Sequence, residues 1–290
     1  MGKQFSISAR QQLNDSDLAA IKELESSCNS FEGLRLRLNW GMLRERKPDE
    51  TNDFLCHDST GRLIGFLALY GFGRAEMEVS GMVHPSYRRS GVFSALLDRA
   101  AAECRKRDVK SLLFFYDRNS TSGTAFVKQT GSACDHSEYR MELPGDMPPV
   151  DLKYPVDVRR AEPSDFDMLA ELDSICFGIP VEESKTFYKE NSLLDSDELY
   201  IAVLDGKEIG MFKLYKEKNE IMIFGFGIKP EYRGRGYGRA TLGKAVNTAL
   251  ARRPAKVSLE VDCVNETALS LYKSCGFEII TAYDYYRLPV

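Results

Sequence analysis

The chain has 290 residues, of which 43% are apolar and 28% are charged. This length suits two domains of roughly 145 residues each, and the apolar fraction is enough for folded cores, which excludes disordered and fibrous proteins. The 39 basic and 43 acidic side chains give a formal net charge of −4, so we expect no general adhesion to nucleic acid or to a membrane. No apolar run approaches the ~18 residues that a membrane-spanning helix needs.

The cysteines and histidines predict a cytoplasmic protein without a metal. The seven cysteines are odd in number and scattered, with no Cys-x-x-Cys pair, which is typical of reduced thiols. The three histidines, His57, His84 and His136, lack the spacing of metal ligands. We therefore expect packing cysteines and no zinc site.

The sequence matches itself at a constant offset of 145 residues. At this offset Gly65 lies on Gly210 and Pro85 lies on Pro230, with further matches before and after them. Glycines and prolines fix backbone geometry, so their recurrence in the same order indicates two copies of one fold. The repeat predicts a first copy at 1–143, a proline-containing linker at 144–155 and a second copy at 156–290.

In the second copy, apolar periodicity predicts alternating strands and helices. An Asp-Gly pair at 205–206 predicts a hairpin, and the nearly all-apolar strand that follows it is typical of one covered on both faces. This order predicts an α/β fold, in which two copies of a mixed central β-sheet are flanked by helices. We expect strands at 156–159, 199–204, 209–215, 221–228, 257–261 and 279–288, and helices at 164–176 (capped by Ser164), 236–252 and 266–274.

A glycine-rich turn follows the apolar strand 221–228. Residues 230–239 read Pro-Glu-Tyr-Arg-Gly-Arg-Gly-Tyr-Gly-Arg, with three glycines in five positions. The unpaired N–H groups at the start of the next helix and the positive end of its dipole suit a pyrophosphate, with Arg233, Arg235 and Arg239 as countercharges. The spacing fits neither the dinucleotide nor the P-loop motif. The alternative is an ordinary flexible strand-to-helix turn.

A second motif lies downstream. Leu259-Glu260-Val261 leads to Asn265, and Leu271-Tyr272 leads to Gly276-Phe277. Together with the glycine turn, this pattern resembles the GCN5-related N-acetyltransferase (GNAT) family over essentially all of 156–290, and more loosely over the first half. Arg233, Gly236 and Gly238 match the Arg/Gln-x-x-Gly-x-Gly/Ala signature of that family.

The resemblance implies acetyl-CoA as cosubstrate and a small-molecule or peptide amine as acceptor. In this family, the strand before the turn binds the acetyl group and the pantetheine arm through its backbone, the turn holds the pyrophosphate, and an asparagine contacts the cofactor arm. The residues that match these positions are Phe226, Gly227, Ile228, Arg233, Gly234, Arg235, Gly236, Tyr237, Gly238, Arg239 and Asn265.

The resemblance also implies two catalytic residues. Tyr272 matches the tyrosine that protonates the departing thiolate, and core packing is the alternative for it, because it lies on an apolar helical stripe. Glu260 matches the general base of one branch of the family, and a structural carboxylate at a strand end is the alternative. Gly225 stands where the wider family more often has its base, and Glu220 is a weaker candidate that would act through water.

The first copy departs from the motif at three positions. Phe93 stands where the second copy has Gly238, and Phe114 or Phe115 stands in the place of Glu260. With a one-residue slip that matches Asn119 to Asn265, Phe126 takes the place of Tyr272 and has no proton to donate. We therefore expect a degenerate first half that shapes the acceptor pocket or supports the fold, or that holds CoA without turnover.

The sequence as a whole predicts an acetyl-CoA-dependent N-acetyltransferase with its active site in the second copy. The alternatives are a non-catalytic module that binds or senses acyl-CoA and an interaction scaffold built from two spent copies. Residues 146–290 carry 19 basic and 24 acidic side chains, a net charge of −5 that mildly favours a cationic amine. The sequence is compatible with both a monomer and a homodimer.

Overall fold

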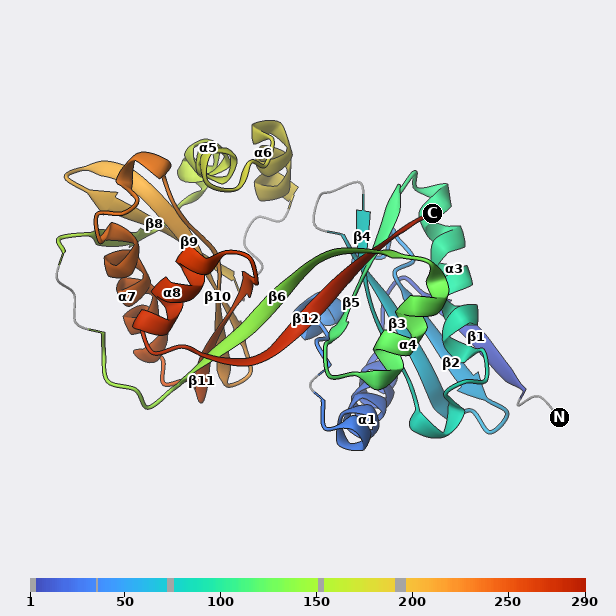
Figure 1. The fold of residues 1–290 in the computed structure, drawn as a ribbon. Coiled ribbons are helices and arrows are strands. Elements are labelled where there is room, and N and C mark those ends of the chain that lie inside the picture. Colours follow the sequence, from blue (N-terminus) through green and yellow to red (C-terminus); the bar gives the residue numbers. More distant parts are fainter. Residues whose placement is uncertain (1–3, 35, 72–75, 151–153, 191–196) are drawn as a thin grey trace. The chain divides into compact units, whose positions relative to one another are not determined.

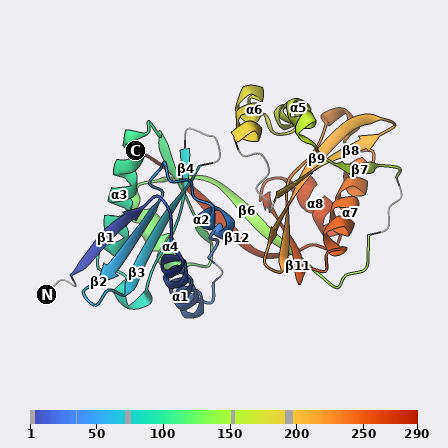
Figure 2. The ribbon, with the colours of Figure 1, turned by 180° about the vertical axis from the view of Figure 1, so that it is seen from behind.

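The computed structural model describes the whole chain except residues 1–3, 35, 72–75, 151–153 and 191–196. The chain divides into two compact units, seen in Figures 1 and 2. Unit 1 comprises Met1–Ser137 and Thr281–Val290, and unit 2 comprises Glu138–Ile280.

Unit 1 is one mixed sheet with helices on both faces. Its strands lie in the order β1-β2-β3-β4-β5-β12, antiparallel except for the parallel pair β4–β5. One face packs on α3 and α4 through residues such as Leu96 and Phe126, and the other packs on α1 and α2 around Phe66 and Trp40. The elements are β1 (Phe5–Arg10), α1 (Asp15–Glu32), α2 (Trp40–Arg44), β2 (Asp53–Asp58), β3 (Leu63–Gly71), β4 (Glu76–Val83), α3 (Val92–Lys106), β5 (Ser111–Asp117), α4 (Thr121–Thr130), β6 (Ala133–Pro144) and β12 (Glu278–Pro289).

Unit 2 repeats this arrangement with the order β7-β8-β9-β10-β11-β6, in which β10–β11 is the parallel pair. The main core lies between the sheet and α7 and α8, and includes Leu242 and Phe277. A second core joins α5 and α6 to the other face over β8 and β9. The elements are β7 (Asp157–Arg160), α5 (Phe166–Phe177), α6 (Val181–Glu190), β8 (Asp197–Leu204), β9 (Lys207–Glu217), β10 (Glu220–Ile228), α7 (Tyr237–Leu250), β11 (Lys256–Asp262) and α8 (Glu266–Ser274).

The last strand of each sheet comes from the other copy of the repeat. In unit 1, Tyr283–Pro289 of β12 pair with Ser111–Asp117 of β5, and in unit 2, Glu138–Pro144 of β6 pair with Lys256–Asp262 of β11. The units therefore differ from the contiguous halves 1–143 and 156–290 that the repeat predicts. The reason is that β6 and β12 each pass from one unit into the other.

The expected strands and helices of unit 2 are otherwise present, with three differences. The helix expected from Ser164 begins at Phe166, because a 3₁₀ turn at Pro163–Asp165 with a capping box precedes it. Helix α6 was not predicted. Strand β10 is well buried on the α7 and α8 side, at Ile221 and Ile223, and only partly buried on the other side. Of the helices in the described ranges, none combines the length and the apolar character needed to cross a membrane.

Candidate functional site in unit 2

The parallel strands β10 and β11 separate halfway along their length. Their pairing covers only Glu220–Ile223 against Lys256–Leu259, although β10 continues to Ile228 and β11 to Asp262. Backbone groups beyond the paired part therefore lack ladder partners on the facing strand, which leaves them for another hydrogen-bonding group. Residues 226–228, predicted to bind the cosubstrate, lie in this separated part.

A β-bulge accompanies the separation. The register of β10 with β9 shifts between Phe224 and Gly227, and Gly225 adopts a left-handed φ of 54°. Gly227 is required for packing, because a Cβ there would lie 2.7 Å from the Cβ of Cys176 and 2.8 Å from the ring of Phe177. The bulge thus bends β10 away from β11 and lets the end of α5 approach its backbone.

The glycine turn joins β10 to α7. Gly234 and Gly236 have φ values of 72° and 85°, which favour glycine strongly. Gly236 also packs against the ring of Tyr154, where there is no room for a Cβ. Helix α7 begins at Tyr237, so its first-turn N–H groups have no partner within the helix. A phosphate bound at this turn would therefore meet backbone N–H groups.

The arginines of the turn do not converge on one point. The Nε atom of Arg233 donates to the carbonyl of Ile228 at 2.7 Å, and an Nη atom of Arg239 donates to the carbonyl of Ser274 at 3.0 Å. Arg235 is exposed. Arg233 thus braces the end of β10, and Arg239 covers the end of α8.

Gly238 lies in the first turn of α7, where a methyl group fits. A Cβ built there would meet Leu271 at 3.7 Å and Ile228 at 3.9 Å, which are ordinary contacts. Packing within the protein therefore does not require a glycine here. The missing side chain leaves space between the end of β10 and α8.

Asn265 caps α8, and Tyr272 lies within it. The Asn265 side chain accepts a hydrogen bond from the N–H of Ala268 at 3.1 Å and caps the helix. Tyr272 is buried, with its ring edge-on to Phe226 and Phe277. Burial raises the pKa of Tyr272 to about 12, so its hydroxyl stays protonated. Tyr272 is therefore both a core residue, as the alternative held, and the neighbour of a residue in the separated part of β10.

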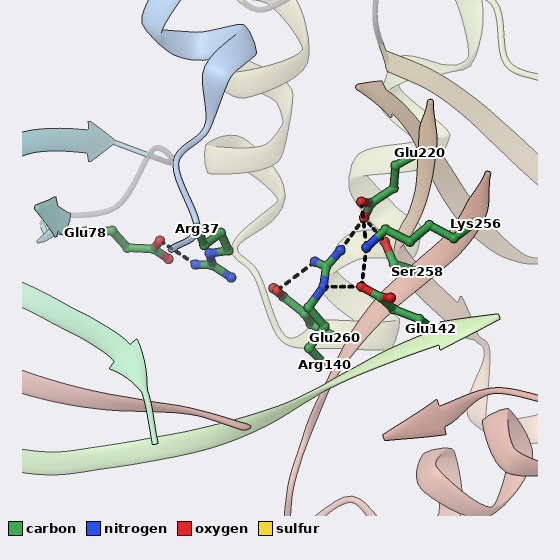
Figure 3. Close-up of polar contacts among 8 residues, drawn as sticks. All are labelled: Arg37, Glu78, Arg140, Glu142, Glu220, Lys256, Ser258 and Glu260. Atoms are coloured by element: carbon green, nitrogen blue, oxygen red, sulfur yellow. Dashed lines mark hydrogen bonds and ion pairs between the residues drawn. The ribbon is translucent and has the colours of Figure 1, made fainter. Parts of the chain in front are cut away.

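Glu260 is the first residue of β11 beyond its pairing with β10. It belongs to a charged cluster on the sheet face opposite α7 and α8 (Figure 3). Arg140 lies at the centre of the cluster, with Nη1 3.5 Å from Glu260 and Nε 3.3 Å from Glu142, and it also pairs with Glu220. Glu260 is therefore engaged in an ion pair at the mouth of the separated strands.

Glu220 is a structural member of the cluster. It accepts a hydrogen bond from Ser258 and pairs with Lys256 at 3.3 Å. Burial opposes ionisation, but Arg140, Ser258 and Lys256 outweigh it and lower the pKa of the Glu220 carboxyl. Glu220 also lies six residues before Phe226, about 20 Å along an extended strand. The structure gives no support to Glu220 as a base.

The corresponding space of unit 1 is filled by aromatic rings. Phe93 in α3 stands edge-on to Phe126 in α4, with ring centroids 4.6 Å apart. The same offset of 145 makes Phe93 and Phe126 the counterparts of Gly238 and Leu271, the two residues that face each other in unit 2. The expected one-residue slip is therefore wrong, since the helix caps Ser120 and Asn265 are also 145 apart, and Val127 is the counterpart of Tyr272.

A carboxylate joins the turn of unit 1 to the start of α4. Glu32, at the end of α1, pairs with Arg88 at 2.7 Å and accepts hydrogen bonds from Ser120 and Ser122, each at 3.2 Å. Arg88 also donates from Nε to the carbonyl of Val83, as Arg233 does to that of Ile228. Unit 1 thus keeps the turn but links it to the start of α4 through Glu32.

Aromatic residues replace the Glu260–Arg140 pair in unit 1. Phe115 is the counterpart of Glu260, and it faces Tyr285 of β12 across the sheet with ring centroids 5.6 Å apart. The guanidinium of Arg37 lies over the Phe115 ring at 4.1 Å. It also pairs with Glu78 at 3.2 Å (Figure 3). The two units therefore share backbone register but not side-chain chemistry at this position.

The comparisons with known proteins agree with this fold. The profile of the acetyltransferase (GNAT) family matches residues 18–129 and again residues 166–277. These two ranges make up most of the chain, which therefore belongs to the acetyltransferase (GNAT) family and contains two of its domains. Acetyl-CoA is the general donor in this family.

Several family members resemble this chain. The mycothiol acetyltransferase of Kytococcus sedentarius is 25% identical over 86% of this chain and 85% of its own length. The human N-acetylaspartate synthetase is 30% identical over 31% of this chain, and the match spans only 30% of that protein. A GCN5-related N-acetyltransferase from Sphaerobacter thermophilus has the same fold, with a TM-score of 0.79 and 20% identity over 98% of this chain and 95% of that one.

Sequence reasoning missed the two ion-pairing residues that distinguish the units, Arg140 and Glu32. Arg140 lies in a strand with charged residues at every second position, 138, 140 and 142, which is a signal of one polar face. Nothing in the sequence indicates that this face joins β11. Glu32 ends a helix and carries no signal of its partners.

Proposed function

We propose that unit 2 transfers an acetyl group from acetyl-CoA to an amine. The observation that carries this proposal is the separation of β10 from β11 beside a glycine turn with an open Gly238. The same place in unit 1 holds the Phe93 ring and the Glu32 carboxylate. The family's general use of acetyl-CoA supports the choice of donor.

In this proposal, the backbone of unit 2 does most of the binding. Residues 226–228 offer the N–H and carbonyl groups that β11 leaves unpaired to the acetyl and pantetheine groups. The turn 234–239 directs its N–H groups and the dipole of α7 at the pyrophosphate. Asn265 faces the cofactor arm as the capping residue of α8, and its amide N–H₂ retains donor capacity while its oxygen caps.

Glu260 and Tyr272 have opposite roles in proton transfer. Glu260 accepts one proton from the amine nitrogen as the nitrogen–carbon bond forms at the thioester carbonyl. Tyr272 donates to the sulfur as the carbon–sulfur bond breaks, so the products are an amide and a free thiol. Exchange with water returns both residues to their starting protonation states.

Calorimetric titration of acetyl-CoA tests where the site lies. We expect one site per chain in the wild type and no binding in Gly238→Phe, which copies the residue of unit 1. Phe93→Ala is the matched control, and it should leave the affinity unchanged because it alters only unit 1. Binding that survives Gly238→Phe and disappears in Phe93→Ala would place the site in unit 1 and contradict the proposal.

Turnover distinguishes an enzyme from a binding module. With acetyl-CoA and a panel of glycinamide, spermidine, glucosamine and butylamine, we expect release of free thiol with at least one amine. A protein that binds acetyl-CoA at unit 2 but releases no thiol with any amine would favour the acyl-CoA-binding alternative.

A further inference from the structure

Arg140 and Glu260 face each other across the edge of the unit 2 sheet. They are paired residues in the antiparallel register of β6 and β11, and both side chains lie on the face opposite the main core. The Arg140 side chain is 10% exposed and that of Glu260 is 15% exposed, so little solvent screens the pair. Because β11 has already left β10 at this point, the pair lies at the mouth of the separated strands.

The other residues of the cluster hold the Arg140 guanidinium in place for its contact with Glu260. Lys256 binds both Glu142 and Glu220, and Ser258 donates to Glu220. These two carboxylates are therefore supported by groups other than Arg140. Arg140 donates to Glu142 through Nε and to Glu220 through Nη2, and its Nη1 is directed at Glu260. A guanidinium held at two nitrogens is fixed in position for its third contact.

The strand exchange brings this guanidinium to the site. Residue 140 belongs by sequence to the first copy of the repeat, and it reaches unit 2 because β6 pairs with β11. In unit 1, the same register positions hold Phe115 and Tyr285, whose rings are tilted by 33° to one another and carry no charge. The ion pair is thus specific to the unit with the open glycine turn.

We propose that Arg140 is a positioning residue, which holds the Glu260 carboxylate at the mouth of the separated strands for proton acceptance. A carboxylate has acceptor sites on two oxygens, so the pairing through Oε1 is compatible with proton acceptance at Oε2. This inference rests on the proposed function, because it requires Glu260 to be the base. It adds that the catalytic unit depends on a side chain supplied by the sequence of the other copy.

The test compares kcat and KM in Arg140→Met, Arg140→Lys and Glu260→Gln, with the best amine of the panel as acceptor or, if none reacts, water. We expect Arg140→Met to lower kcat by about 10- to 100-fold, with little change in KM for acetyl-CoA. Arg140→Lys should retain part of the wild-type kcat because it keeps the charge. Adding guanidinium ion to Arg140→Ala should restore activity in part.

Lys256→Met is the matched control. It removes a cation from the same cluster that pairs with Glu142 and Glu220, so it should lower the melting temperature as much as Arg140→Met does and leave kcat unchanged. In the double variant of Arg140→Met and Glu260→Gln, kcat should equal that of Glu260→Gln alone, because the two residues act as one unit.

The outcomes separate this inference from the proposed function. A loss of kcat in Glu260→Gln but not in Arg140→Met would overturn the role of Arg140 and leave the base in place. Full activity in Glu260→Gln would instead reject Glu260 as the base. Crystal structures give a readout that needs no turnover: the Glu260 carboxylate should move in Arg140→Met or, if that variant does not fold, in Arg140→Lys, and keep its place in Lys256→Met.

Discussion

Tyr272 is a packing residue of unit 2 to which the proposed function also gives a catalytic role. Its ring is part of the main core of unit 2. The ring also stands edge-on to Phe226, which lies in the separated part of β10. A free thiol has a pKa of about 8.5, well below the value of about 12 to which burial raises Tyr272. In the proposed reaction the hydroxyl therefore first donates a hydrogen bond to the sulfur as charge develops on it, and the proton moves as the carbon–sulfur bond breaks.

We expect Tyr272→Phe to lower kcat by about 10²-fold and to leave the affinity for acetyl-CoA nearly unchanged, because only the donor is lost. Since the pKa of Tyr272 lies near 12, wild-type kcat should not fall from loss of this proton between pH 8 and pH 10. Tyr200→Phe is a matched control, because Tyr200 is also a core tyrosine but bonds to Glu198 at 2.6 Å. Equal kcat in Tyr272→Phe and Tyr200→Phe would leave Tyr272 with packing alone.

Two glycines of the turn should respond differently to alanine. Gly238→Ala fits the structure and removes a flexible residue from a helix, so the free energy of unfolding should stay level or rise by about 0.5 kcal/mol, and acetyl-CoA should still bind, because the family signature accepts Gly or Ala at this position. Gly236→Ala should destabilise unit 2 by about 1–2 kcal/mol or more, because φ is 85° and the new Cβ would lie 2.4 Å from the Tyr154 ring. Denaturant unfolding and calorimetry measure the two effects. Unchanged stability in Gly236→Ala would contradict the need for glycine at this point of the turn.

At the level of elements, the exchange of β6 and β12 decides which residues share a core. Tyr283 and Tyr285 of β12 are buried with Leu113 of unit 1, and Asp284 binds Arg118. Figure 1 shows β12 running alongside β5. The C-terminal strand is thus a stabilising part of unit 1, although it follows the last helix of unit 2 in the sequence.

Trp40 offers a specific test, because it is the single tryptophan of the chain and is buried in unit 1. Tyr285→Ala removes a ring that is 2% exposed and should destabilise unit 1 by about 3 kcal/mol, which lowers the denaturant midpoint of Trp40 fluorescence. Phe277→Ala removes a ring of similar burial eight residues earlier, in the core of unit 2. It should move the Trp40 transition much less. If Phe277→Ala shifts it as far as Tyr285→Ala, the strand exchange is not what stabilises unit 1.

At the level of the whole molecule, one fold is used in two ways. The ends of α1 and α5 correspond at the same offset, so Glu32 is the counterpart of Phe177. In unit 1 this residue binds Arg88 and the start of α4, whereas in unit 2 it packs on Gly227 and makes no such link. Substitutions at a few positions thus give the two units different contacts around the same turn.

The sequence by itself determined the repeat, the α/β class and the backbone features of the site. Glycine positions and apolar periodicity act locally, so the turn at 234–238, the strand before it and the helix at 266–274 lie where they were predicted. The structure also supports Phe115 as the counterpart of Glu260, because the offset of 145 holds without a slip through β5 and α4.

Only the tertiary structure decided which strand completes each sheet, and with it the surroundings of Glu260. A strand whose faces alternate correctly can pair at the edge of either sheet, so periodicity cannot assign β6 and β12 to a unit. The ion pair between Arg140 and Glu260 joins residues 120 positions apart, and the Glu32 contacts join α1 to α4. Such long-range contacts depend on how the elements pack, and no local pattern in the sequence encodes them.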